Sequence, residues 1–448
     1  MKRSSKIIVN IMIIISCVFL NGCDIGDIEN AFGLGMHSKN DDKPKDHVEV
    51  QIEYYDKDDD NVMPTEGSPK KDDSEEDLSV ETDIPDPYED GSFTDSIDKQ
   101  YTISENDENI ITISFAGDVC LTEGCSVLNY IKRHDNDMKN SFDNSLLDRM
   151  ISSDIFMLNN EFPYSDRGAP LEGKMYTFRA APSSASYLKD IGTDIVSLAN
   201  NHCYDYGPDA LIDTFKILKY IGMPYVGAGK NIEEAQMPAY FTVNNKKIAI
   251  VAATQIEGYD NPETKEATAT SPGVLRCLDT ARVKEVIADA DKNSDFVICF
   301  VHWGTEKSDL VRSWQRSTAK DMISAGADFV IGAHSHCLQG IEYIDGVPVF
   351  YSLGNFLFNS NTQDTCLVTL NLDSSCADAL DIDSVQFIPC IQSGGQTVEA
   401  NDNDRARIIK YEQGISYNAS IDSNGYVSQS SVDHNIQNGK NTSPMRDE

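Results

Sequence analysis

The chain has 448 residues, of which 40% are hydrophobic, and its formal net charge is −36 at pH 7. It is long enough to form at least one large globular domain. The charge argues against nucleic acid as a partner, because the sequence has no basic stripe that would neutralise phosphate groups.

The N-terminus has the pattern of a bacterial secretion signal. Two basic residues, Lys2 and Arg3, precede a short apolar run, and Cys23 ends the motif LNGC. The run is too short to be a comfortable membrane span, and a cysteine after Leu-x-Gly resembles a lipoprotein cleavage site. We expect residues 1–23 to be a lipoprotein signal peptide, with Cys23 lipidated and the protein held on the outer face of the cell membrane. Ordinary secretion and an uncleaved anchor are the alternatives.

Residues 24–108 differ in character from the rest of the chain. This part includes DKDDDNVMPTEGSPKKDDSEEDLSVETDIPDPYEDGS, which is acidic, has few apolar residues and shows no helical or strand period. Such a segment cannot bury enough apolar surface to offset its ordering entropy, so we predict an acidic disordered linker. We favour a solvated spacer that lifts the domain off the membrane. The alternative is a tether that repels anionic polymers of the cell wall.

Residues 109–396 alternate between predicted helices and strands. A strand is predicted for ITISFAGDVC, and a helix followed by a strand for NSLLDRMISSDIFMLNNEF and SASYLKDIGTDIVSLANNH. Helical spacing follows in PDALIDTFKILKYIG, and a hairpin is predicted for AYFTVNNKKIAIVAATQ. Two more helix–strand units are DTARVKEVIADADKNSDFVICFVHWG and QRSTAKDMISAGADFVIGAHSH. This alternation predicts an α/β fold in which helices cover parallel strands.

The C-terminal part of the chain is predicted from two apolar stretches and a polar end. The stretches GVPVFYSLGNFLFN and TCLVTLNLD have the composition of strands, and we assign them to a second sheet. Residues 397–448, which end in SQSSVDHNIQNGKNTSPMRDE, are polar, and we predict a flexible tail there.

Polar side chains gather where the predicted strands end. The residues that share this position are Asp118, Glu161, Asn201, His202, His302, His334 and His336. Taken alone, each has an ordinary explanation as a turn or loop residue. Ligands of α/β sheets bind at the carboxyl ends of the strands, however, so we expect these side chains to converge. Together they form a mixed nitrogen and oxygen set that suits one or two divalent ions, with Mn, Zn or Fe favoured.

This set of residues indicates a class of chemistry. Two ions at such a site can hold a bridging hydroxide and clamp a phosphoryl oxygen. His202, next to Asn201, is placed to protonate the leaving alkoxide as a catalytic acid. Asp205 could orient His202 by accepting its other ring proton, and an Asx turn before Gly207 is the alternative role for Asp205.

A series of longer motifs points to a family. In unbroken order from about residue 110 to residue 360 the chain has GDVCLTEG, NNEFP, SLANNHCYDYG, GAGKNIEEA, VHWGTE, QRSTAKDMISAGADFVIGAHSHCLQGIE and VPVFYSLGNFLF. These motifs resemble the CapA family, which is named for poly-γ-glutamate capsule synthesis and is related to calcineurin-like metallophosphoesterases. The resemblance implies a metallophosphoesterase-like four-layer α/β/β/α sandwich.

The resemblance also implies a division of the ligands between two ions. By position, Asp118 and His336 serve one ion, Asn201, His302 and His334 serve the other, and Glu161 bridges them. His202 is then the acid. The chain departs from the related phosphoesterases at Cys120, where they have a histidine. A protonated thiol is a poor ligand, so two interpretations stay open, namely one firm and one labile ion, or a single ion.

The expected function combines the signal, the resemblance and the site. We expect a lipid-anchored protein of the bacterial membrane that acts in capsule or poly-γ-glutamate biosynthesis or export. Membrane capsule-synthesis proteins and an anionic polymer are the expected partners. One alternative is an extracellular metal-dependent phosphoesterase or polymer hydrolase, and another is a non-catalytic scaffold of a membrane synthetase complex. The capsule role follows only from the resemblance, since fold does not determine function.

Overall fold

The structure is a computed structural model that describes residues 99–103, 109–256, 265–377 and 379–431. The expected signal peptide, Cys23 and nearly all of the expected acidic linker lie outside these residues. Within the described part of the chain, no helix is long and apolar enough to cross a membrane.

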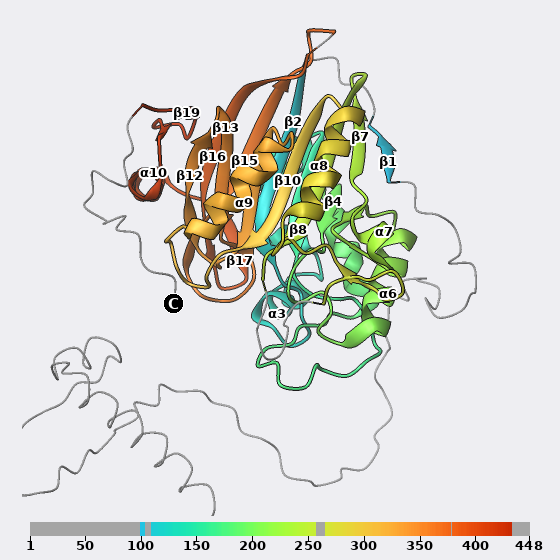
Figure 1. Cartoon of the computed structure of the whole chain (residues 1–448). Coiled ribbons are helices and arrows are strands. Elements are labelled where there is room, and N and C mark those ends of the chain that lie inside the picture. The colour runs from blue at the N-terminus through green and yellow to red at the C-terminus, as the bar shows by residue number, and fades with distance from the viewer. Residues whose placement is uncertain (1–98, 104–108, 257–264, 378, 432–448) are drawn as a thin grey trace, which may run out of the picture. The chain divides into compact units, whose positions relative to one another are not determined.

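Two twisted sheets form the centre of the fold (Figure 1). In spatial order, the first sheet consists of β1 (Gln100–Thr102), β7 (Ala239–Val243), β8 (Lys246–Thr254), β10 (Phe296–Trp303), β11 (Phe329–His334), β13 (Val347–Leu353) and β12 (Leu338–Ile344). The second sheet consists of β17 (Gln396–Glu399), β16 (Asp381–Ser393), β15 (Gln363–Asp373), β2 (Ile110–Val119), β3 (Ile155–Asn160), β4 (Ile195–Ser197) and β5 (Tyr225–Val226), with β14 (Asn355–Leu357) beside β2.

The inner faces of the sheets pack against each other. Successive side chains of a strand point to opposite faces, so every second residue reaches the space between the sheets. On β10, Ile298 and Phe300 belong to this inner core, while Cys299 belongs to the outer one. The rings of Phe115 on β2 and Phe329 on β11 stack across the interface with centroids 5.6 Å apart. Because both faces of the central strands are buried, these strands read as continuous apolar runs in the sequence.

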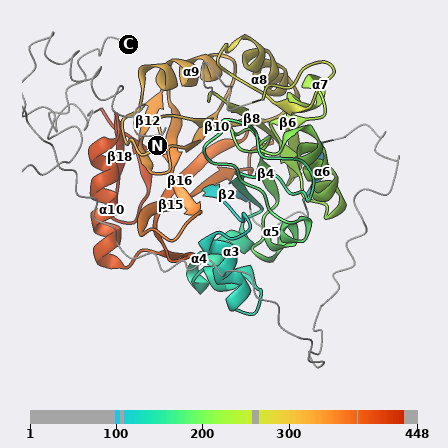
Figure 2. The same cartoon turned by 90° about the horizontal axis from the view of Figure 1, so that it is seen from below.

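Helices cover the outer face of each sheet (Figure 2). Buried side chains of α3 (Ser126–Arg133), α4 (Asn144–Ser152), α5 (Tyr187–Asp190) and α6 (Gly207–Tyr220) pack on the second sheet. Those of α8 (Ala281–Asn293) and α9 (Ser313–Ser324) pack on the first sheet. The prediction of a four-layer α/β/β/α sandwich is thereby confirmed. Other short elements are η1 (Met138–Ser141), η2 (Pro182–Ser186), α7 (Ile232–Ala235), and the paired strands β6 (Ala228–Gly229) and β9 (Gly273–Val274).

An aspartate stands at the start of four parallel strands and ties each one to its neighbour. Asp194, before β4, donates its amide N–H to the carbonyl oxygen of Phe156 at 2.9 Å, and its carboxylate accepts the N–H of Phe156 at 2.8 Å. The same two-way contact joins Asp154 to Thr112, Asp295 to Lys247 and Asp328 to Val297. These contacts fix the register where the strands begin, and therefore also the positions of their carboxyl ends.

One strand lies in a different sheet from the one we predicted. VPVFYSL forms β13, which we assigned to the second sheet, yet it pairs with β11 in the first sheet through Val349 and Val330. TCLVTLNLD forms β15 and does belong to the second sheet. The strand pattern predicts that a segment is extended but carries little information on its pairing partner, which is why this assignment was wrong.

The predicted boundary at the N-terminal end is also wrong. The end of the expected linker folds as β1, an edge strand that runs parallel to β7. Lys99, which precedes it, is 1% exposed, and its Nζ donates to the carbonyl oxygen of Glu234 at 3.3 Å. A short polar strand with a single buried lysine has no apolar run to reveal it, so composition assigned it to the linker.

The predicted polar tail is wrong for residues 397–431, while residues 432–448 lie outside the described part. The folded region includes α10 (Asp402–Ile415), β18 (Ala419–Ile421) and β19 (Val427–Gln429). Helix α10 packs on β12 and β16 and buries Ile408, Ile409 and Ile415. Only a few of its residues are apolar, and an exposed polar face dominates its composition.

Candidate metal centre

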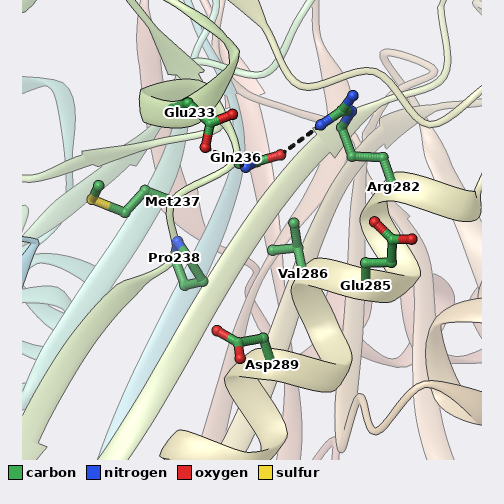
Figure 3. A pocket seen from close by; sticks show the side chains of 8 residues that line it. All are labelled: Glu233, Gln236, Met237, Pro238, Arg282, Glu285, Val286 and Asp289. Carbon is green, nitrogen blue, oxygen red and sulfur yellow. Dashed lines mark hydrogen bonds between the residues drawn. The ribbon is translucent and has the colours of Figure 1, made fainter.

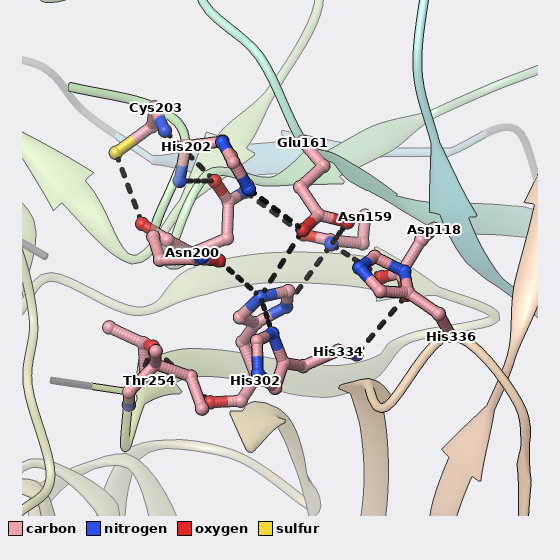
Figure 4. Close-up of polar contacts among 12 residues, drawn as sticks. Asp118, Asn159, Glu161, Asn200, His202, Cys203, Thr254, His302, His334 and His336 are labelled. Carbon is pink, nitrogen blue, oxygen red and sulfur yellow. Dashed lines mark hydrogen bonds and ion pairs between the residues drawn. The ribbon is translucent and has the colours of Figure 1, made fainter. Parts of the chain in front are cut away.

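The structure brings the predicted ligands together at the ends of strands from both sheets (Figure 4). They are Asp118 on β2, Glu161 after β3, Asn201 after β4, His302 on β10, His334 at the end of β11, and His336 just beyond it. All but His336 are at most 4% exposed. We expected these strands to feed a single edge, whereas β2, β3 and β4 belong to one sheet and β10 and β11 to the other.

One group of donor atoms surrounds Nε2 of His302. Asn201 Oδ1 lies 2.9 Å from it, His334 Nδ1 3.0 Å and Glu161 Oε1 3.6 Å. Ligands bound at about 2.1 Å to one ion lie roughly 3.0–3.4 Å from one another in octahedral or tetrahedral geometry. The spacing of this group is therefore close to that of a first coordination shell.

A second group lies beside the first and shares Glu161 with it. The potential ligand atoms of Asp118, Glu161 and His336 all lie within 4.8 Å of one another, as do those of Glu161, His302 and His334. Asp118 Oδ2 is 3.4 Å from Nδ1 of His336. Nδ1 donates to Asn355 Oδ1 at 2.8 Å, which leaves Nε2 of this ring available. The thiol of Cys120 instead contacts Thr122 Oγ1 at 3.0 Å, and burial raises its pKa.

The surroundings of Glu161 show whether these residues fit a cation. In the described part of the chain, its buried Oε1 has no hydrogen-bond partner. Burial, and then the negative charge of Asp118, raise the pKa of Glu161 well above its ordinary value. A buried carboxylate oxygen without a partner is costly, and a divalent ion would satisfy it. The residues present therefore fit one or two metal ions.

The electrostatics of the imidazoles agree with that fit. Burial and the neighbouring imidazoles hold the pKa of His302 and of His334 well below the ordinary value. Both rings are consequently neutral at pH 7, which is the state that binds a metal. Burial also lowers the pKa of His336, but the hydrogen bond and charge of Asp118 outweigh it and give a net rise.

His202 stands next to the ligand groups with its ring held on two sides. Its Nδ1 lies 2.7 Å from Asp205 Oδ2, and its Nε2 lies 3.9 Å from Glu161 Oε1. The ring of Phe178 packs on the imidazole with centroids 4.2 Å apart. Because the carboxylate can only accept, Nδ1 carries a proton towards Asp205 and Nε2 faces the centre.

The backbone around the centre adopts conformations that ordinary residues avoid. His334 has φ +99° and His336 has φ +55°, in the left-handed region. Such strain persists only where the surroundings enforce it, and it clusters at functional sites. Gly117 allows another close approach, since a Cβ there would lie 2.0 Å from the carbonyl oxygen of Gly354. This approach brings Asn355 next to Asp118, with which it is paired in register.

Several residues of the centre were missed by sequence reasoning. Asn159 Nδ2 donates to Asp118 Oδ1 at 2.7 Å and lies 3.2 Å from Nδ1 of His302. Its place at the end of β3, directly before Asn160 and Glu161, was a usable signal. Lys174 and Phe178 come from an irregular loop, and no strand end or motif singled them out.

A separate surface groove of about 340 Å³ lies between α7 and α8 (Figure 3). It is lined by Glu233, Gln236, Met237, Pro238, Arg282, Glu285, Val286 and Asp289, none of which belongs to the two ligand groups. Arg282 Nη1 donates to Gln236 Oε1 across it at 2.9 Å. The ligand groups are thus a feature of the strand ends and not of this groove.

The fold and the site define an α/β/β/α sandwich protein with a buried candidate centre for divalent ions at the strand ends of its two sheets. The sequence profile of the bacterial capsule synthesis protein PGA_cap matches residues 112–360, and the chain belongs to this family. The resemblance inferred from the motifs is therefore confirmed.

Individual relatives agree with the family. The capsule biosynthesis protein CapA of Bacillus anthracis is 31% identical over 252 residues, which cover 55% of this chain and 58% of that protein. The PGA biosynthesis protein CapA of Bacillus subtilis (strain 168) is 35% identical over 193 residues, which cover 42% of this chain and 50% of that protein. The chain thus spans 50–58% of the length of these two relatives.

A weaker similarity links the chain to a solved structure. A 5'-nucleotidase from Candida albicans is 13% identical, covers 64% of this chain and 53% of its own, and superposes with a TM-score of 0.34. A TM-score of this size does not establish a common fold.

Proposed function

We propose that this protein acts in the production or export of poly-γ-glutamate or a related capsule polymer at the outer face of the cell membrane. We further propose that its domain is a metal-dependent hydrolase of phosphate esters. Membership of the capsule synthesis family supports the first part, together with the LNGC motif that ends in Cys23. The second part is supported by the geometry of the centre.

The observation that best supports a hydrolase is the position of Glu161. Its Oε1, which has no hydrogen-bond partner among the described residues, lies 3.6 Å from His302 Nε2 and 3.9 Å from His202 Nε2, and its carboxylate belongs to both ligand groups. A purely structural metal site is closed by its protein ligands. Here Nδ1 of His202 is hydrogen-bonded to Asp205, and Nε2 points at Glu161, the ligand that both groups share. This is the orientation that a proton donor needs.

The residues divide into holders of the ions and a carrier of the proton. Asn201, His302, His334 and Glu161 would hold one ion, and Asp118, Glu161 and His336 would hold the other. Mn, Zn and Fe suit this mixed set of nitrogen and oxygen ligands. Such ions polarise a phosphoryl oxygen and make a nucleophile of water at neutral pH. Membrane capsule-synthesis proteins and an anionic polymer remain the proposed partners.

His202 supplies the proton that the leaving oxygen needs. Asp205 accepts the Nδ1 proton of His202 at 2.7 Å and so fixes the tautomer and the direction of the ring. With Nδ1 protonated towards Asp205, Nε2 must first take up a second proton, which the imidazolium then gives to the departing alkoxide, a contribution of roughly 10²–10⁴ in rate. Asn159 helps to hold two of the candidate ligands in place, since its amide contacts both Asp118 and His302.

One experiment separates a hydrolase from a non-catalytic scaffold. Metal content is measured for the purified full chain and for His202→Ala, and both are assayed with Mn²⁺ or Zn²⁺ on glycerol 3-phosphate and bis(4-nitrophenyl) phosphate. We expect His202→Ala to keep its metal and to hydrolyse the alkyl ester about 100-fold more slowly or worse. A wild-type protein that binds metal and hydrolyses neither ester would contradict the hydrolase and favour the scaffold.

A further inference from the structure

A loop covers the candidate proton donor. Residues 165–179, which we call the strap, contain no helix or strand and lie between Tyr164 and Ala180, which form a bridge. Irregular loops of this length are usually either functional or disordered. The strap is tied down at its start, where Arg167 Nε donates to Asp213 Oδ2 on α6 at 2.9 Å.

The close contact between the strap and the segment after His202 is built into the sequence. Gly168 has φ +83°, and a Cβ at this position would lie 2.0 Å from the carbonyl oxygen of Tyr206. Near the other end of the strap, the guanidinium of Arg179 lies 4.2 Å from the centroid of the Tyr206 ring. Only glycine allows the close approach of residue 168 to Tyr206, so the sequence of the strap suits its place against this segment.

Three contacts from the strap converge on Asp205. The amide N–H of Leu171 donates to its carbonyl oxygen at 2.9 Å. Lys174 Nζ donates to Oδ1 at 2.6 Å, and the amide N–H of Phe178 donates to Oδ2 at 2.7 Å. Oδ2 is the same oxygen that accepts the ring proton of His202. The strap therefore determines where the carboxylate that orients His202 points.

Lys174 has a second contact that reaches the ligands. Its Nζ also donates to the carbonyl oxygen of Asn201, whose side chain belongs to the group around His302. The lysine side chain is 5% exposed, and that of Asp205 is fully buried. A buried ammonium is costly unless it is paired and hydrogen-bonded, and removing one member of such a pair leaves the other uncompensated. Lys174 thus connects Asn201, a candidate ligand, to Asp205, the carboxylate that orients the candidate proton donor.

We propose that Lys174 is a positioning residue, which locks the strap onto Asp205 and Asn201 and thereby holds His202 with Nε2 towards the centre. Its effect on the strap depends only on the structure, whereas its effect on catalysis rests on the proposed function. Lys174 itself touches neither substrate nor reacting atoms in this role. It acts through Asp205.

The first test reads the strap without any assay of activity. Amide hydrogen exchange of Leu171 and Phe178 is measured in the full chain for wild type, Lys174→Met, Lys174→Arg and Lys320→Met, where Lys320 is an exposed lysine of α9. We expect exchange at least about tenfold faster in Lys174→Met, because the strap opens locally. Exchange should be close to wild type in Lys174→Arg, which keeps the cation, and unchanged in Lys320→Met. Unchanged exchange in Lys174→Met would overturn the proposal.

Lys174→Gln covers the case in which Lys174→Met does not fold. Glutamine keeps a donor without the charge, so the same exchange difference is expected with a smaller amplitude. Thermal unfolding of both variants shows whether faster exchange is local to the strap or reflects a lower global stability. A uniform rise in exchange across α6 and the strands would mean that Lys174 is only a structural ion-pair partner, which also overturns the proposal.

The second test asks whether Lys174 affects the donation of a proton by His202. Loss of a proton donor slows an ester with an alkoxide leaving group much more than one with 4-nitrophenolate, which leaves without protonation. We expect Lys174→Met to slow glycerol 3-phosphate hydrolysis at least about tenfold and to slow bis(4-nitrophenyl) phosphate hydrolysis much less. The double variant Lys174→Met/His202→Ala should be no slower than His202→Ala, because the two residues act as one unit.

The two tests fail separately. Equal slowing of both esters, or a double variant much slower than His202→Ala, would contradict the path through His202. If the wild type hydrolyses neither ester, the proposed function fails, while the exchange result still decides whether Lys174 locks the strap.

Discussion

At the scale of single residues, Asn201, Glu161 and His334 are far apart in the sequence and meet around Nε2 of His302. We expect His302→Ala and His334→Ala each to lower the metal affinity by about 10–100-fold or more, because each removes one ligand from the group that contains Asn201, His302, His334 and Glu161. Metal content after dialysis measures this directly. His134→Ala is the matched control, since His134 is an exposed histidine whose ring lies on Tyr130. Full occupancy in both ligand variants would rule out their assignment.

The ligand candidates could be predicted from the sequence because each one follows an apolar run that had to be a strand. Asn159 also follows an apolar run, so it could have been predicted in the same way. Lys174 could not be predicted, since it lies in a loop without a period or motif. Its role depends on how the strap folds over Asp205, and that is a tertiary contact between residues 31 positions apart in the chain.

At the scale of elements, Asp194, the aspartate before β4, makes the start of this strand sensitive to pH. Burial raises the pKa of Asp194 from 3.8 to about 6, and the hydrogen bond from Phe156 only partly opposes this. A carboxyl group with a raised pKa stabilises the fold below its unfolded pKa, and this stability is lost as the pH rises towards 6.

Asp194→Asn should remove that pH dependence while its amide oxygen still accepts the N–H of Phe156. Relative to wild type, the variant should gain about 1–2 kcal/mol between pH 4.5 and pH 7.5. Urea unfolding at both pH values measures the difference. A constant offset between the two proteins would show that Asp194 does not titrate in this range.

Helix α10 tests whether the C-terminal segment belongs to the fold. Ile408 is fully buried in the contact of this helix with the sheets. We expect Ile408→Ala to lower the free energy of unfolding by about 2–4 kcal/mol, through lost burial and the cavity that remains. Lys410→Ala, on the exposed side of the same helix, should change it by less than about 0.5 kcal/mol. Equal effects of the two substitutions would mean that α10 does not pack as described.

The central elements could be predicted and their partners could not. Continuous apolar runs such as those of β10 and β11 have few interpretations other than buried strands. The distribution of strands between two sheets depends on pairing over long sequence separations, as between β2 and β15, and no local pattern encodes it. Helix α10 was missed for a different reason, since its buried face needs only a few apolar side chains among many charged ones.

At the scale of the whole molecule, the proposed anchor lies in the part of the chain outside the described residues. We expect Cys23→Ser to move the protein from the membrane fraction to the soluble or secreted fraction, because the acyl chains on Cys23 would anchor the protein after signal cleavage. Cys17→Ser, within the apolar run, should leave the protein in the membrane fraction. Cys23→Ser protein that stays with the membrane would point to an uncleaved anchor.

Metal binding by the intact protein tests the central claim most directly. The full chain is stripped with a chelator and titrated with Mn²⁺ or Zn²⁺ by calorimetry, alongside Glu161→Gln, which keeps the shape of the side chain and removes its charge. We expect at least one ion bound per folded chain, and binding that is at least about tenfold weaker in Glu161→Gln. A folded wild-type protein that binds neither ion, or binds equally well without the carboxylate of Glu161, would contradict it.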